Sequence, residues 1–246
     1  MTLAQIVKNS NNIVFFGGAG VSTESGVPDF RSEAGLYSAQ EKYGHAPEFL
    51  LSRECFLKMP ELFFQYYKEN MIHLDAKPNT AHDALARLEQ AGKLSLVITQ
   101  NIDGLHQAAG SKNVCELHGA NAKQYCVNCK KRYSLEYVID PMNCDVYVPK
   151  CEVCSGTVRP DVVLYGEGLN DAVVSRALGA IEATDCLIVG GTSLSVYPAA
   201  GLVSYAPPSA KIILINKGKT AYDDDYDLVI RDSIGKVFAE LIDEVL

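Results

Sequence analysis

The residues best suited to chemistry in this sequence include two closely spaced cysteine pairs. Cys126 and Cys129, followed by Cys151 and Cys154, form the pattern C-x2-C-x21-C-x2-C. Thiolates on two tight turns match a tetrahedral zinc shell, and a full shell of thiolates leaves no position for a reacting water. We therefore predict that these cysteines bind a structural zinc ion, in preference to a redox dithiol or a nucleic-acid-binding ribbon.

A glycine-rich stretch near the N-terminus could hold a phosphate. Residues 17–32 read GGAGVSTESGVPDFRS and follow an apolar run at 13–16. Glycines after a strand let backbone N–H groups approach a pyrophosphate. Thr23 stands where the G-x-G-x-x-G pattern has its third glycine, so a purely structural turn stays open. Residues 28–31 then place an acid, an aromatic ring and a guanidinium together, which favours a ligand nearby.

Three further polar segments also follow apolar runs, at residues 99–106, 116–119 and 190–199. The carboxyl ends of parallel strands meet at one edge of a sheet, where open α/β folds bind their ligands. These segments therefore predict a shared site, with His118 as a candidate base. A histidine after a strand is also often a hydrogen-bonded structural residue.

The elements that must position these residues are short apolar runs separated by helix-like segments. The runs lie at residues 13–16, 94–98, 162–164, 187–189 and 212–215. Buried strands alternating with helices predict an α/β fold with a Rossmann-like, doubly wound, mainly parallel sheet. The segment 79–92 reads as one such helix, capped by Asn79 or Thr80, with Leu85 and Leu88 on one face.

Two stretches interrupt the alternation and predict a second, smaller domain. Residues 32–75 contain a loop and an aromatic-rich helical module, and residues 120–158 contain the cysteine pairs. We expect both to be insertions into a larger domain made of residues 1–31, 76–119 and 159–246.

Composition narrows the class of protein. The chain has 246 residues, 48% of them hydrophobic, and a net charge of −8. That charge argues against a sequence-independent hold on nucleic acid. Neither a secretory signal nor a membrane-spanning run is evident. We expect a cytoplasmic monomer that binds neither nucleic acid nor membrane.

The chain resembles the sirtuin family of NAD-dependent protein-lysine deacylases in the identity and order of its motifs. These are GAGVSTESGVPDFR, TQNIDGLH, LHG, the paired CxxC and GTSLSVYPA. The resemblance spans almost the whole chain, and we expect a bacterial member. It implies a Rossmann-like NAD-binding domain, a small domain with a helical module and a zinc module, and NAD meeting acetyl-lysine in the cleft between them.

The resemblance also implies roles for individual residues. The residues implied in catalysis are His118, Asn101 and Asp103. Those implied in NAD binding are Ala19, Gly20, Thr23, Phe30, Arg31, Gln100, Ile102, Asp103, Thr192, Ser193, Asn216, Lys217 and Ile234. The segment implied to pair with a substrate peptide is Val163, Leu164, Tyr165, Gly166 and Glu167, by addition of a strand.

The implied reaction consumes NAD and transfers no hydride. The amide oxygen of acyl-lysine attacks the ribose carbon as nicotinamide leaves, and His118 then deprotonates a ribose hydroxyl. That hydroxyl attacks the alkylamidate, and hydrolysis of the adduct gives free lysine and acyl-ADP-ribose, besides the nicotinamide already released. Family members that take acidic acyl groups carry Tyr-x-x-Arg, for which the equivalent here is Tyr66 to Glu69. A carboxylate at Glu69 facing the acyl group would repel an acidic one, so we expect neutral acyl groups, acetyl first.

Two alternatives share parts of this pattern. A mono-ADP-ribosyltransferase would use the same NAD site with another nucleophile. A zinc-ribbon protein that binds NAD without turnover would have no need of a base such as His118. A hydride-transferring dehydrogenase is disfavoured by Thr23 in the fingerprint.

Overall fold

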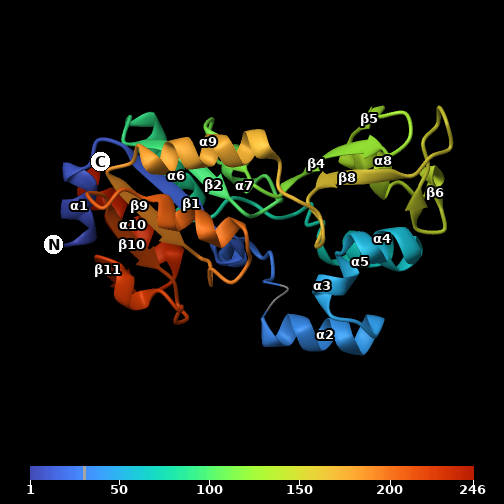
Figure 1. Cartoon of the computed structure of the whole chain (residues 1–246), viewed down its shortest axis with the longest axis horizontal. Coiled ribbons are helices and arrows are strands. Elements are labelled where there is room, and N and C mark those ends of the chain that lie inside the picture. The colour runs from blue at the N-terminus through green and yellow to red at the C-terminus, as the bar shows by residue number, and fades with distance from the viewer. Residues whose placement is uncertain (30–31) are drawn as a thin grey trace.

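A parallel sheet forms the larger part of the molecule (Figure 1). The computed structural model describes residues 1–29 and 32–246. The six strands of the sheet are β1 (Ile13–Gly17), β2 (Leu94–Thr99), β3 (Val114–Glu116), β9 (Cys186–Gly190), β10 (Lys211–Ile215) and β11 (Leu228–Ile230). They lie in the order β11-β10-β9-β1-β2-β3, so the connections run outward from β1 in both directions. The strand order therefore reverses between β1 and β9, the point at which doubly wound sheets bind ligands.

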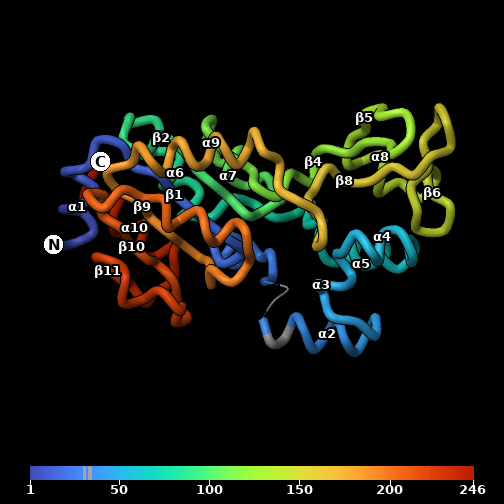
Figure 2. The backbone as a smooth tube through the Cα atoms, viewed as in Figure 1, coloured from blue at the N-terminus to red at the C-terminus, as the bar shows by residue number. Residues whose placement is uncertain are grey.

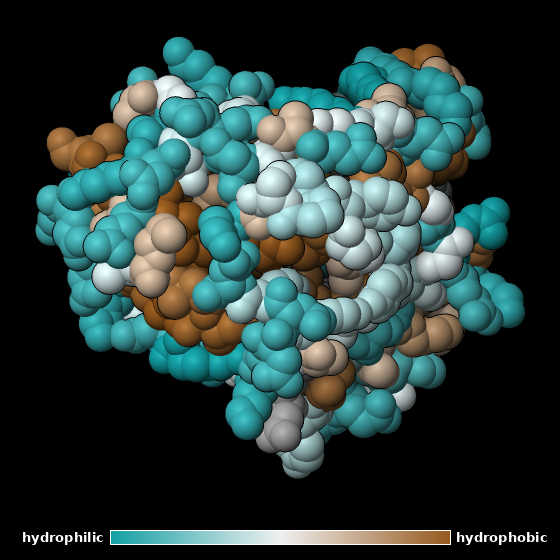
Figure 3. Space-filling model, turned by 60° about the vertical axis from the view of Figure 1, so that its left-hand side comes forward, coloured by the Kyte–Doolittle hydropathy of each residue, from teal (hydrophilic) through white to brown (hydrophobic). Residues whose placement is uncertain are grey.

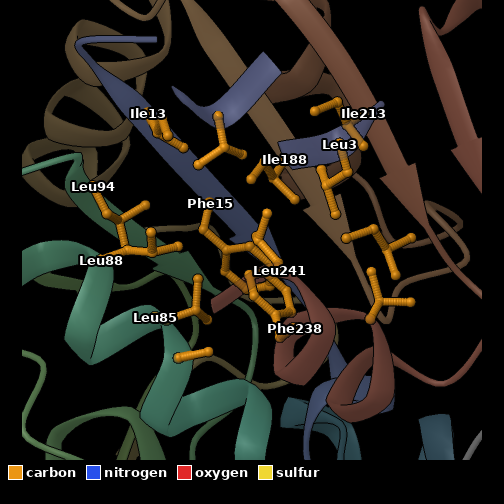
Figure 4. Packing of buried hydrophobic residues seen from close by; sticks show 14 of the residues in the cluster. Leu3, Ile13, Phe15, Leu85, Leu88, Leu94, Ile188, Ile213, Phe238 and Leu241 are labelled. Carbon is orange, nitrogen blue, oxygen red and sulfur yellow. The ribbon is translucent and has the colours of Figure 1, made fainter. Parts of the chain in front are cut away.

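Helices cover both faces of this sheet because its strands carry apolar side chains on both. Ile13 and Phe15 point into one core, and Val14 and Phe16 point into the other. The first core holds α1 (Leu3–Asn9), α6 (Thr80–Gln90) and α10 (Ile234–Val245). Figure 4 shows Phe15 at its centre, against Leu85 and Phe238. The second core holds α9 (Asp171–Glu182) and a 3₁₀ helix at Ala199–Tyr205.

The helix predicted at 79–92 is confirmed as α6. Asn79 caps it, since its side-chain oxygen accepts a hydrogen bond from the Ala81 N–H at 2.9 Å. Leu85 and Leu88 are buried on one face against the sheet, as their spacing predicts.

Among the described residues, the smaller part of the molecule is built from two sheets and five α-helices. Its strands are β4 (Gly119–Cys126), β5 (Arg132–Tyr133), β6 (Cys144–Asp145), β7 (Val148–Pro149) and β8 (Val158–Val162). Its helices are α2 (Glu33–Tyr43), α3 (Pro47–Leu50), α4 (Arg53–Lys58), α5 (Pro60–Asn70) and α8 (Leu135–Ile139). The short α7 (Leu105–Ala108) lies in the larger part, beside α6. Further short 3₁₀ helices are Ala19–Val21, Thr23–Ser25, Pro141–Asn143 and Asp223–Asp225.

One strand prediction is wrong. The apolar run at 162–164 does not join the parallel sheet, because β8 ends at Val162 and pairs antiparallel with β4. An apolar run reports burial and carries no information on strand direction, so sequence pattern could not separate the two cases. The edge strand β11 was not anticipated, and its residues are only half-buried.

The two interruptions of the sheet share a single hydrophobic core. Phe63 and Phe64 of α5 pack in one cluster with Val138 of α8 and Val148 of β7. The traces in Figure 1 and Figure 2 place these elements together at one end of the molecule. The predicted fold class is thus confirmed, with a doubly wound sheet and a smaller domain made of a helical and a cysteine-bearing module. The exact domain boundaries stay a prediction.

Most of the face shown in Figure 3 is hydrophilic, and hydrophobic residues show mainly in the recesses between polar ones. Among the described residues, none of the helices combines the length and the apolar character needed to cross a membrane.

The two cysteine pairs lie on turns of the same form. In the first turn the Lys130 N–H donates to the Cys126 carbonyl at 3.1 Å, and Lys130 has φ 62°. In the second, the Ser155 N–H donates to the Cys151 carbonyl at 2.8 Å, and Ser155 has φ 55°. The left-handed residue after each pair turns the chain so that both thiols of the pair face the same point.

The four sulfur atoms fit a zinc ion. All lie within 4.8 Å of one another, with Cys126 Sγ to Cys154 Sγ at 3.5 Å and Cys129 Sγ to Cys151 Sγ at 3.6 Å. A tetrahedral shell with Zn–S bonds of about 2.3 Å requires sulfur separations of about 3.8 Å. The predicted ligand set is therefore brought together at the spacing that structural zinc needs.

We expect removal of zinc to unfold the small domain, because structural zinc contributes on the order of 10 kcal/mol to the folding of comparable modules. Cys129→Ser should abolish stoichiometric zinc, measured by elemental analysis, and lower the melting temperature measured by circular dichroism. Cys144→Ser is the matched control, since Cys144 lies in the same module outside the sulfur cluster. A zinc-free Cys129→Ser variant that melts like the parent would contradict a structural role for the metal.

Candidate active site

A cavity of about 250 Å³ lies between the two parts of the molecule. The predicted site residues that line it on the side of the parallel sheet are Ala19, Gln100, Asn101, Ile102, Asp103 and His118. On the side of the smaller domain the lining residues include Tyr67, Met71 and Asn121. The segments expected to meet at the carboxyl edge of the sheet thus do so around one cavity.

The glycine-rich stretch is held against the loop after β9. The Gly20 N–H donates to the Gly191 carbonyl at 2.8 Å. A Cβ added at Gly20 would lie 2.8 Å from Gly191 Cα, so only glycine allows this approach. Thr23 is exposed, and its hydroxyl donates back to the Gly20 carbonyl at 3.0 Å. Thr23, which replaces the third glycine of the G-x-G-x-x-G pattern, therefore closes the turn with its side chain.

A buried serine joins the two polar residues predicted to act beside it. Ser22 Oγ donates to Asp103 Oδ2 at 2.7 Å and accepts from Asn101 Nδ2 at 3.0 Å. The other Asp103 oxygen accepts the Leu105 N–H at 2.9 Å. Ser22 is fully buried and lines the cavity, yet the sequence reasoning did not single it out. The sequence did contain a signal for this role. A serine stands between the glycines and Pro28, and the amide of Asn101 and the carboxylate of Asp103 needed a buried hydrogen-bond partner.

His118 lines the cavity and is oriented by a backbone carbonyl. Its Nδ1 lies 2.8 Å from the Gln100 carbonyl oxygen. A carbonyl can only accept, so in the neutral ring Nδ1 carries the hydrogen and Nε2 carries the lone pair. The contact thus assigns Nε2 as the basic atom. The next residue, Gly119, has φ 78°, and a Cβ there would lie 2.0 Å from the Asp161 carbonyl oxygen.

Gln100 and Thr192 lie side by side at the reversal point of the sheet. Gln100 Nε2 donates to Thr192 Oγ1 at 3.2 Å, and both residues are buried. Thr192 Oγ1 also accepts the Leu194 N–H at 3.2 Å, which fixes the loop after β9.

Four further predicted cofactor residues extend along the same edge of the sheet, outside this cavity. Ser193 follows β9 and is exposed, and its hydroxyl lies 2.8 Å from Ser195 Oγ. Asn216 and Lys217 follow β10, and Ile234 begins α10. Phe30 and Arg31 lie outside the described residues.

The predicted peptide segment forms the floor of the cavity where β8 ends. Val163, Leu164, Tyr165, Gly166 and Glu167 all line it. Two backbone hydrogen bonds join Tyr165 to the helical module, from its N–H to the Leu51 carbonyl at 3.1 Å and from the Arg53 N–H to its carbonyl at 2.9 Å. Val196, Tyr197 and Pro198 also line the cavity and were not singled out for the peptide.

The expectation that Glu69 faces the acyl group is wrong. Its carboxylate accepts hydrogen bonds from Lys42 Nζ at 2.5 Å and Tyr43 OH at 2.6 Å, away from the cavity lining. Tyr67 of α5 and Met71, which caps the end of that helix, are four residues apart and both face the cavity, whereas Glu69 lies between them on the other side of the helix. The helix phase, which the sequence alone does not give, decides which residue meets the ligand.

The side of the cavity next to α5 is uncharged and firmly held. Tyr67 OH donates to Asn121 Oδ1 at 2.9 Å and accepts from Gln124 Nε2 at 3.2 Å. Burial raises the pKa of Tyr67, so this hydroxyl stays neutral. Among the described residues, no lysine or arginine lines the cavity.

Comparison with known proteins gives one consistent family. The model of the Sir2 family matches residues 18–198. An NAD-dependent protein deacetylase of Clostridium acetobutylicum is 56% identical over 240 residues, which cover 98% of this chain and 96% of the relative.

Two solved structures agree with that match. A Sir2 structure with a deacetylated peptide and 3'-O-acetyl ADP-ribose has a TM-score of 0.90 at 39% identity, covering 98% of this chain and 96% of that chain. A Sir2 structure with a propionylated peptide has a TM-score of 0.87 at 38% identity, covering 98% and 95%. With the family model, the relative and these structures in agreement, the chain belongs to the Sir2 family.

Proposed function

We propose that this protein is an NAD-dependent protein-lysine deacetylase that cleaves NAD, releases nicotinamide and transfers the acyl group of acyl-lysine to ADP-ribose. The observation that carries the proposal is the meeting of His118 with Asn101 and Asp103 at one cavity. Support also comes from the deacetylase name of a relative that is 56% identical over nearly the whole chain. The bacterial origin of that relative fits a bacterial member of the family.

NAD fits the edge of the sheet where the strand order reverses. Ala19, Gly20 and Thr23 would hold the diphosphate, because they form the turn after β1 at this edge of the sheet and none of them is fully buried. The residues that would hold the adenosine end are Thr192, Ser193, Asn216, Lys217 and Ile234. Phe30 and Arg31 would complete the cover of the nicotinamide ribose.

Four polar side chains of the cavity would have distinct tasks in this reaction. NAD supplies a ribose carbon that becomes electrophilic as nicotinamide departs. Asn101 and Asp103, with the Ile102 backbone, would bind the carboxamide of the leaving group, and the Ser22 hydroxyl holds both side chains in place beforehand. His118 Nε2 would take a proton from a ribose hydroxyl, since its Nδ1 hydrogen is already committed to the Gln100 carbonyl.

The peptide would lie as an added strand between residues 163–167 and residues 196–198, which line the same cavity from different elements. Main-chain hydrogen bonds would then give affinity independent of sequence around the acyl-lysine. This mode of binding suits an enzyme that acts on many exposed lysines.

The acyl group would be neutral, with acetyl preferred. The acyl group would lie against Tyr67, Met71 and Ile102, and the described lining offers no lysine or arginine to an acidic acyl group. We therefore base this selectivity on the absence of a lysine or arginine from the described lining. Repulsion by Glu69 does not explain it, because Glu69 does not line the cavity.

We also propose that the enzyme acts as a cytoplasmic monomer without nucleic acid. None of the eight cysteines is in a disulfide, and four of them form the proposed zinc set, which fits a reducing compartment. The net charge of −8 opposes binding to nucleic acid.

The direct test compares the parent with His118→Ala, using NAD and an acetyl-lysine peptide. We expect nicotinamide release that depends on the acetylated peptide, with acetyl-ADP-ribose as co-product, and a loss of about 10²- to 10⁴-fold in the variant. His45→Ala is the matched control, because His45 stacks on Phe49 at 4.5 Å and does not line the cavity. Labelling of protein by ADP-ribose without deacetylation would favour a mono-ADP-ribosyltransferase instead.

Acyl selectivity is tested with butyryl-lysine and succinyl-lysine peptides, whose acyl chains match in length and differ in the terminal carboxylate. An unpaired carboxylate costs several kcal/mol in a part-buried site, so kcat/KM for succinyl should be lower by at least about 100-fold. Equal rates for the two peptides would show that a cation reaches the acyl group.

A further inference from the structure

Arg159 is a buried arginine directly beneath the proposed peptide segment. It lies on β8, is 6% exposed, and packs under the Phe56 ring at 5.1 Å and near the Tyr125 ring at 5.8 Å. A buried guanidinium needs partners for its hydrogens, since leaving them unpaired costs free energy. The hydrogen-bond partners of Arg159 therefore show which parts of the chain it fixes.

Those partners lie at both ends of the segment. Arg159 Nη1 donates to Glu167 Oε1 at 2.7 Å and Nη2 donates to Glu167 Oε2 at 3.0 Å, a bidentate pair. Nη2 also donates to the Val162 carbonyl at 2.8 Å, and Nε donates to the Pro160 carbonyl at 3.2 Å. One side chain thus joins the end of β8 to the far end of the loop.

Glu167 turns that ion pair into a constraint on the backbone. Its Oε2 accepts the Leu164 N–H at 3.0 Å, and its own N–H donates to the Leu164 carbonyl at 2.9 Å. Burial acts to raise the pKa of Glu167, but the hydrogen bonds from Arg159 and the Leu164 N–H, together with the charges of Arg159 and Arg53, outweigh it and hold that pKa below its ordinary value. The carboxylate stays charged and keeps the turn from Leu164 to Glu167 closed.

We propose that Arg159 is a positioning residue that fixes the peptide-binding segment in its binding shape before the peptide arrives. The inference rests on the proposed function, in which residues 163–167 pair with the substrate. Arg159 holds Val162 and Glu167, and backbone hydrogen bonds hold Tyr165 to Leu51 and Arg53. The backbone between them therefore loses less conformational freedom when the peptide binds. Glu167 therefore serves the substrate through Arg159 and the Leu164 turn.

A purely structural role for the Arg159–Glu167 ion pair can be distinguished from a positioning role by experiment. Buried ion pairs can be replaced by apolar side chains with little loss of stability, so a change in melting temperature decides nothing. A positioning role predicts a selective rise in the KM for peptide. The NAD site would be unaffected, because the Arg159 contacts lie on the peptide side of the cavity.

The test measures steady-state kinetics of Arg159→Met, Arg159→Lys and Glu167→Gln with NAD and an acetyl-lysine peptide. We expect Arg159→Met to raise the KM for peptide by at least about 10-fold while the KM for NAD stays within about twofold. Arg159→Lys, which keeps the charge and loses the bidentate fork, should be intermediate. The double variant Arg159→Met with Glu167→Gln should be no worse than the poorer single variant, because both break the same contact.

The matched control is Arg132→Met. Arg132 pairs with Asp161 at 2.6 Å in the same sheet, but its side chain is 69% exposed and it holds no part of the segment. Its KM for peptide should equal that of the parent. Hydrogen exchange of the free proteins provides a second readout, since the Leu164 amide should lose protection in the Arg159 and Glu167 variants only.

The outcomes separate the two proposals. A parent that neither binds nor turns over the acetylated peptide would overturn the proposed function and this inference with it. An active parent whose Arg159→Met variant keeps the parental KM for peptide, or loses affinity for NAD and peptide equally, would overturn the inference alone.

Discussion

The close approach of two glycine turns determines the geometry of this site. Gly20 and Gly191 meet backbone to backbone where the strand order reverses, and a Cβ on Gly191 would lie 2.4 Å from the Val21 nitrogen. This contact sets the turn after β1 directly against the loop after β9. Ser22 follows in the first turn and Thr192 in the second, so the same contact places the serine toward Asn101 and the threonine toward Gln100.

The smaller domain supplies the opposite wall, and its rigidity has two separate sources. The zinc turns fix one end of the three-stranded sheet, while the aromatic side chains of α5 fill the core beneath it. His118 stands immediately before β4, where the chain passes from one part of the molecule to the other. Its carbonyl accepts the Val163 N–H at 2.9 Å, so the proposed base and the proposed peptide segment share a backbone hydrogen bond.

The sequence predicts those features that depend on spacing and strand ends. The cysteine set follows from the spacing of its pairs, and the meeting of residues 99–106 with His118 follows from strand ends, because parallel strands bring their carboxyl ends together. The choice of Asn101 and Asp103 within that segment came from the family resemblance. Features that depend on helix phase or loop shape could not be predicted from the sequence. The choice of Tyr67 over Glu69 at the cavity needed the packing of α5, and the partner of Arg159 needed the turn that brings Glu167 back toward β8.

Four consecutive residues connect the two halves of the proposed chemistry. The Gln100 carbonyl orients His118, the Asn101 and Asp103 side chains hold Ser22, and the Ile102 carbonyl accepts the Asn121 N–H at 2.9 Å from β4. Each of these polar groups has its protein partner before any ligand is present. An environment already arranged in this way need not reorganise as charge develops, which is the main electrostatic advantage of an active site over water. Residues 100–103 must therefore be held by both domains, because a shift of either domain would displace the proposed base and the leaving-group pocket together.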